Sequence, residues 1–161
     1  MEKIRVFTVG GTIDKIYFDA KSTYEVGPPN IAEILNGLSL NVEFEVTSLM
    51  QKDSLDMTPE DRALILKHVL DTREERIIIT HGTDTMVETA KTLSQVRGKR
   101  IVLTGALSPA LFKSSDAMFN IGCAVTAVQI MKYGVYIAMN GQLFDYDKVK
   151  KDVSQNRFVA L

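Results

Sequence analysis

Four short runs of apolar, mostly β-branched residues recur along the chain, and each is followed by small or polar residues. They are Ile4–Val9, Arg76–Thr80, Arg100–Thr104 and Val135–Met139. Runs of this length and composition predict strands that are buried on both faces. The segment from Val42 to Leu49 begins with alternating apolar and polar residues, which predicts a strand with one wetter face. Such strands limit the possible folds, because other elements must cover both faces of their sheet.

Helical patterns lie between the predicted strands. Thr58 followed by Pro59 is a typical helix start, and Asn30 with Glu33 resembles a capping box before a short helix that ends at Gly37. Two further apolar stripes at helical spacing are Met86, Ala90, Leu93 and Val96, and Phe119, Cys123, Thr126 and Ile130.

Because strands alternate with helices, we expect an α/β fold with three layers, α/β/α, around a mainly parallel sheet. Residues 16–26 carry aromatic and turn-forming side chains without a helical period, which predicts a flap hairpin inserted after the first strand. The tail from Asn140 to Leu161 is expected to form short extended pieces.

The chain has 161 residues, of which 45% are hydrophobic, and its net charge is -1. A chain of this size can bury one packed core without disulfides. The balanced charge, without any basic run, favours a small-molecule substrate over nucleic acid or a membrane surface. The lone Cys123 cannot pair within the chain, so we expect a buried structural thiol and a cytoplasmic location.

The loops that follow the predicted strands are dense in hydroxyls and glycines. They are Thr8–Thr12, Lys52–Asp56, Thr80–Thr85 and Thr104–Ala106. The carboxyl ends of parallel strands share one edge of a sheet, so these loops predict a ligand site there. Thr and Gly also cap helices and make turns, and Asp84 suits the first turn of a helix, so a purely structural interpretation stays open.

The motifs of several common chemistries are missing. No phosphate-binding loop follows Gly10-Gly11, and two distant histidines without a cysteine cluster do not predict a metal site, so no cofactor or metal is expected. We expect His81 to have a packing or supporting role and His68 to be solvated. No Ser-His-Asp pattern is present either, which leaves a threonine nucleophile activated by a phenol or by a lysine of lowered pKa.

Two segments together carry a family resemblance. Gly10-Gly11-Thr12-Ile13 after the first strand and His81-Gly82-Thr83-Asp84-Thr85 after a later one resemble the L-asparaginase family of bacterial type, which includes amidotransferase and lysophospholipase relatives. Four other segments extend the resemblance along the chain: 23–27, 53–57, 104–106 and 149–151.

The resemblance implies catalytic roles. Thr12 is the implied nucleophile, with Tyr24 of the flap above it. Thr83, Asp84 and Lys151 are the implied second triad, which helps to deprotonate the attacking hydroxyl or water. Lys151 is favoured over the neighbouring Lys150, whose alternative interpretation is a solvated basic turn.

The resemblance also implies a substrate site. Ser54 and Asp84 are expected to hold the α-carboxylate and α-amino groups, and the Ala106 carbonyl to lie near the leaving amide. The backbone around Gly11 and the amide or side chain of Thr83 are candidate oxyanion donors. Leu55 stands where larger members carry a glutamine that binds the substrate.

The implied reaction converts L-asparagine to L-aspartate and ammonia through an acyl-enzyme on threonine. Residues 1–161 are expected to form a single catalytic domain like the family's N-terminal domain, without the family's C-terminal domain. A homo-oligomer, with a dimer favoured, is expected. The alternatives are a non-catalytic amino-acid-binding module and a partner-dependent subunit of an amide-transferring complex.

Overall fold

The computed structural model describes residues 2–161. Its centre is a six-stranded sheet with the strand order β4-β1-β5-β6-β7-β8. Five of these strands run parallel, and β8 pairs with β7 in the antiparallel direction. The bounds are β1 Ile4–Gly10, β4 Phe44–Lys52, β5 Arg76–Thr80, β6 Arg100–Thr104, β7 Gly134–Met139 and β8 Gln142–Asp145.

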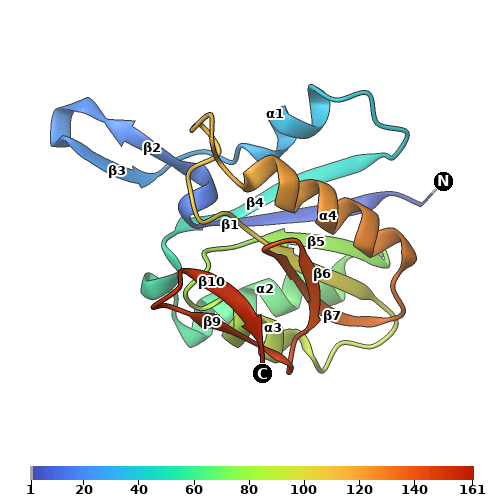
Figure 1. The fold of residues 1–161 in the computed structure, drawn as a ribbon. Coiled ribbons are helices and arrows are strands. Elements are labelled where there is room, and N and C mark those ends of the chain that lie inside the picture. Colours follow the sequence, from blue (N-terminus) through green and yellow to red (C-terminus); the bar gives the residue numbers. More distant parts are fainter. Residues whose placement is uncertain (1) are drawn as a thin grey trace.

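Helices cover both faces of this sheet (Figure 1). The helices α1 (Ile31–Asn36) and α4 (Ala117–Ile130) pack on one face, where Val6, Ile78 and Val102 lie in the shared core. The helices α2 (Pro59–Asp71) and α3 (Met86–Leu93) pack on the other face in a second core. The predicted three-layer α/β/α fold with a mainly parallel sheet is therefore confirmed.

The N-termini of α1 and α2 differ in their capping hydrogen bonds. Thr58 and Asp61 form a full capping box at α2, with Thr58 Oγ1 3.2 Å from Asp61 N and Asp61 Oδ2 2.9 Å from Thr58 N. The capping box expected at Asn30 is wrong, because the Asn30 side chain makes no capping bond to α1. Its Nδ2 instead donates to the Ile13 carbonyl, 3.2 Å away.

The segment after β1 forms the predicted flap. A short 3₁₀ turn, η1 (Thr12–Asp14), leads into an antiparallel hairpin of β2 (Lys15–Phe18) and β3 (Thr23–Val26). This hairpin projects from the body of the molecule (Figure 1). The tail forms the antiparallel pair β9 (Val149–Asp152) and β10 (Arg157–Ala160), which agrees with the short extended pieces expected there.

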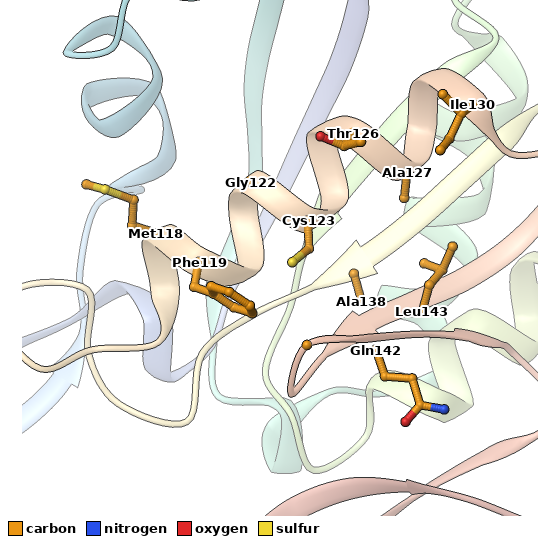
Figure 2. Close-up of a pocket in the computed structure, with 11 residues that line it drawn as sticks. Met118, Phe119, Gly122, Cys123, Thr126, Ala127, Ile130, Ala138, Gln142 and Leu143 are labelled. Carbon is orange, nitrogen blue, oxygen red and sulfur yellow. The ribbon is translucent and has the colours of Figure 1, made fainter.

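Two expectations about single residues are wrong. Cys123 is only partly buried and lines an open groove of about 610 Å³ between α4 and the start of β8 (Figure 2). The cause is that α4 is apolar on its outer side as well as on its core side, so the stripe pattern did not show which residues face inward. His68 is half-buried rather than solvated, since its ring meets the edge of Phe7 with centroids 5.8 Å apart.

No helix within residues 2–161 has the length and apolar character needed to cross a membrane.

Candidate active site

Glycines bring the ends of the central strands into backbone contact. A Cβ placed on Gly11 would lie 2.4 Å from the Gly82 Cα, and one placed on Gly82 would lie 2.6 Å from the Ser54 Cβ. Side chains at these positions would push the loops apart. The loops after β1, β4 and β5 can therefore pack directly, which makes Thr12, Ser54 and Thr83 neighbours at one edge of the sheet.

Three polar side chains meet at this edge. Lys151 Nζ lies 2.8 Å from Thr83 Oγ1 and 2.7 Å from Asp84 Oδ1. The Lys151 side chain is 13% exposed, whereas that of Asp84 is 39% exposed. Side chains alternate along a strand, so Lys151 shares the inner face of β9 with the buried Val149, while Lys150 is exposed. The lysine is thus aligned by a strand of the tail with two residues that follow β5.

Thr12 is the first residue of η1 and is partly exposed. Within residues 2–161, neither the Thr12 N–H nor the Thr83 N–H donates a backbone hydrogen bond. Free amide donors beside a reacting carbonyl are the feature that stabilises an oxyanion. The edge of the sheet therefore combines a hydroxyl, a lysine and two available amide donors.

Ser54 is 1% exposed, and its Oγ has no hydrogen-bond partner in the described chain. An unpaired buried hydroxyl typically costs about 1–3 kcal/mol, so a ligand oxygen at this position would stabilise it. The Ser54 carbonyl accepts a 2.9 Å bond from Thr85 Oγ1, a link that sequence reasoning missed. The neighbouring Leu55 is 72% exposed.

Ala106 follows β6 and is buried. Asn120 Nδ2 donates to the Gly105 carbonyl at 2.9 Å, and Asp116 accepts from the backbone N–H groups of Leu107 and Ser108 at 3.0 and 3.1 Å. These bonds fix the loop on both sides of Ala106. The supporting role of Asp116 was missed because its partners are backbone groups, which no side-chain pattern reveals.

Tyr24 lies on β3 and is 51% exposed. Its ring packs against Tyr17 and Phe112, with centroids 5.2 and 5.6 Å apart. No hydrogen bond joins its hydroxyl to Thr12 in this structure. Tyr24 is therefore docked on the loop that precedes α4, and sequence reasoning did not find its partner Phe112.

Asp14 directly follows the candidate nucleophile segment and is 2% exposed. Burial raises its pKa to about 6. Its Oδ1 accepts from the Asn30 N–H at 2.9 Å, and its carbonyl accepts from the Gly27 N–H at 2.8 Å. These two bonds join the segment that precedes β2 to the segment that follows β3, at the base of the flap hairpin. Sequence reasoning did not identify Asp14, although a charged residue directly after an apolar strand and its glycine turn indicates a functional or structural role.

We expect Asp14→Asn to remove a pH dependence of stability. The pKa of Asp14 is raised from 3.8 to about 6 on folding, so the folded state binds more protons between these values. The resulting stabilisation is complete below pH 4 and is lost as pH rises through 6, a change of about 3 kcal/mol. Urea unfolding at pH 4, 5, 6 and 7 measures it.

In that experiment Asp14→Asn is expected to gain stability over the wild type as pH rises from 4 to 7. The exposed Asp19 of the same hairpin provides the control, because Asp19→Asn should follow the wild-type curve. Parallel curves for Asp14→Asn and the wild type would contradict the prediction.

His81 is fully buried, and burial lowers its pKa to about 4. Both ring nitrogens are hydrogen bonded within the protein, which agrees with the supporting role expected for it. Residues 2–161 contain no group of three His, Cys, Asp or Glu side chains arranged to hold a metal ion.

Comparison with known proteins decides the family. The sequence model described as "Asparaginase, N-terminal" matches residues 3–159. The chain belongs to the asparaginase family. Among its relatives in that family, an L-asparaginase from Thermococcus kodakarensis is 30% identical over 156 residues, which are 92% of this chain and 47% of the relative. L-asparaginase 2 from Escherichia coli is 32% identical over 165 residues, 94% of this chain and 47% of the relative.

Another asparaginase-family relative has a different name. A subunit of glutamyl-tRNA(Gln) amidotransferase from Methanococcus vannielii is 30% identical over 157 residues, 90% of this chain and 36% of the relative. The solved structure of the thermostable T. kodakarensis L-asparaginase superimposes with a TM-score of 0.86 and 27% identity, covering 99% of this chain and 51% of that one. This asparaginase-family chain thus spans about half the length, or less, of these relatives.

Proposed function

We propose that this chain hydrolyses L-asparagine to L-aspartate and ammonia through an acyl-enzyme on Thr12. The contact of Lys151 Nζ with Thr83 Oγ1 and Asp84 Oδ1 is the observation that carries the proposal. A threonine hydroxyl needs a base and an orienting group to become a nucleophile. Thr83, Lys151 and Asp84 supply both functions beside the loop that holds Thr12. The names of the L-asparaginase relatives support the same reaction.

In the proposed first step, Thr12 Oγ attacks the side-chain amide carbon of asparagine. The Thr83–Lys151 pair receives the Thr12 proton and returns it to the leaving nitrogen, so ammonia departs and a β-aspartyl ester remains. The N–H groups of Thr12 and Thr83 stabilise the oxyanion in both steps. In the second step the same pair deprotonates a water, which cleaves the ester and restores Thr12.

The substrate's α-carboxylate and α-amino groups are proposed to bind at Ser54 and Asp84. The unpaired, buried Ser54 Oγ supports this, because a carboxylate oxygen would accept a hydrogen bond from its hydroxyl. The Ala106 carbonyl is proposed to accept a hydrogen bond from the side-chain amide. Gly11 contributes backbone that lies close to Gly82, and the exposed Leu55 contributes a solvent-side contact.

Ammonia release from L-asparagine tests the proposal. Wild-type protein is expected to release ammonia, and Thr12→Ala is expected to lose activity by about 10³-fold or more, because the covalent route needs its hydroxyl. Thr12→Ser keeps the hydroxyl and should retain part of the activity. Full activity in Thr12→Ala would remove Thr12 from the role, and L-glutamine assayed in parallel measures the preference between the two amides.

The amidotransferase relative favours a second candidate, a partner-dependent subunit of an amide-transferring complex. This candidate predicts no ammonia release by the chain alone, while L-asparagine still raises its melting temperature. The same result would suit a non-catalytic amino-acid-binding module. Ammonia release without a partner distinguishes the first proposal from both alternatives.

We also propose a cytoplasmic location and a homodimer. A "probable cytoplasmic L-asparaginase" from Campylobacter jejuni, with a TM-score of 0.84 and 25% identity, supports the location. Light scattering on the purified chain measures the oligomeric state.

A further inference from the structure

A chain of hydrogen bonds, part-buried at Arg62 and fully buried at His81, leads from α2 to the loop that holds Thr83. Arg62 Nε on α2 lies 3.2 Å from Thr89 Oγ1 on α3. Thr89 Oγ1 lies 2.7 Å from His81 Nε2, and His81 Nδ1 lies 2.7 Å from the Gly82 carbonyl oxygen. His81 and Thr89 are both 0% exposed. The proposed catalytic steps do not involve Arg62, Thr89 or His81.

The direction of every bond in this chain can be assigned. The Gly82 carbonyl can only accept, so His81 Nδ1 must carry the proton. The buried ring is neutral, because burial lowers the pKa of His81 to about 4, and its Nε2 therefore accepts. Thr89 donates its hydroxyl proton to Nε2 and accepts from Arg62 Nε–H, which can only donate.

The last bond in the chain acts on the peptide unit between Gly82 and Thr83. This peptide is trans, so its N–H points opposite to its carbonyl and away from the buried imidazole. The Thr83 N–H has no backbone partner in the described chain. A hydrogen bond to the carbonyl of a peptide polarises the unit and strengthens its N–H as a donor. Thr83 also carries the hydroxyl that Lys151 contacts.

We propose that Arg62, Thr89 and His81 form a positioning relay that locks His81 as its Nδ1–H tautomer, and that His81 thereby orients and polarises the Thr83 N–H as an oxyanion donor. This inference rests on the proposed amide hydrolysis for its effect on rate. The tautomer and the state of the Thr83 amide are properties of the folded protein and do not depend on activity.

Thr89→Val tests the relay, because it removes the hydroxyl while keeping the side-chain volume. We expect kcat for L-asparagine to fall by about 3- to 10-fold with KM within about twofold, the size of one lost neutral hydrogen bond to a group that acts in the transition state. Thr89→Ser is expected to restore kcat. The matched control is Thr92→Val on the same helix, since the Thr92 hydroxyl donates to the Glu88 carbonyl within α3 and does not contact the relay.

Nitrogen-15 NMR of the imidazole provides the second readout. The wild type is expected to show a proton on His81 Nδ1, and Thr89→Val, unlike Thr92→Val, is expected to shift the Thr83 amide proton upfield. A proton on Nε2, or equal kcat in Thr89→Val and Thr92→Val, would overturn the relay. If the wild type hydrolyses no amide, the proposed function fails, and the tautomer and the Thr83 amide shift alone decide whether the relay stands.

Discussion

Replacement of Lys151 by methionine is expected to lower kcat for L-asparagine by about 10²- to 10⁴-fold, the range typical for loss of a group that transfers a proton. Lys151 Nζ lies within hydrogen-bond distance of both Thr83 Oγ1 and Asp84 Oδ1. Without Lys151, the Thr83–Lys151 pair that is proposed to receive the Thr12 proton is lost. Methionine keeps an unbranched side chain that is only one atom shorter than that of lysine and carries no charge. KM should change less than kcat, because Lys151 is proposed to transfer a proton and makes no proposed contact with the substrate.

Lys150→Met is the matched control for this variant. Lys150 is the preceding residue of β9 and is exposed, so its removal changes the net charge equally without touching Thr83. Steady-state ammonia release by the two variants and the wild type measures the effect. Equal losses in Lys150→Met and Lys151→Met would show that the charge of the tail, rather than the contact with Thr83, matters.

Gly11→Ala is expected to cost about 3–5 kcal/mol of unfolding free energy, among the largest effects of a single substitution. Gly11 has a φ of 92°, which side chains rarely adopt, and a Cβ there would lie 2.4 Å from both the Cα and the N of Gly82. Both neighbours are backbone, so no side chain can rotate away. The two loops would have to separate, and ammonia release should be lost as well.

Gly122→Ala is the control, because it makes the same substitution at a position where the added Cβ meets no steric clash. Gly122 lies within α4, and apart from its chain neighbours and the backbone of the helix itself, no heavy atom of the described chain lies within 4 Å of a Cβ placed there. Helix propensity predicts a gain of up to about 1 kcal/mol. Urea unfolding of both variants measures the contrast, and similar stabilities for the two would contradict the steric explanation.

The sequence predicted the fold best where runs of consecutive apolar residues mark buried strands. Mostly buried runs such as Arg76–Thr80 pair in register with Arg100–Thr104 as parallel strands, and a helix begins at Thr58-Pro59 as these residues predicted. Local patterns failed where a side chain had a distant partner. Asn30 bonds the turn after β1 instead of capping its own helix.

By itself, the sequence determined the main elements and their layering, because burial and turn chemistry repeat at periods that local residues define. The family resemblance came instead from two motifs, Gly10-Gly11-Thr12-Ile13 and the segment His81–Thr85. It also marked the loops that carry Thr12, Ser54 and Thr83. Only the tertiary structure decided which groups meet: Lys151 reaches Thr83 from 68 positions away along the chain, and His81 contacts Thr89 of the next helix. The physical reason is that such contacts depend on the packing of whole strands and helices, whose distances no local pattern contains.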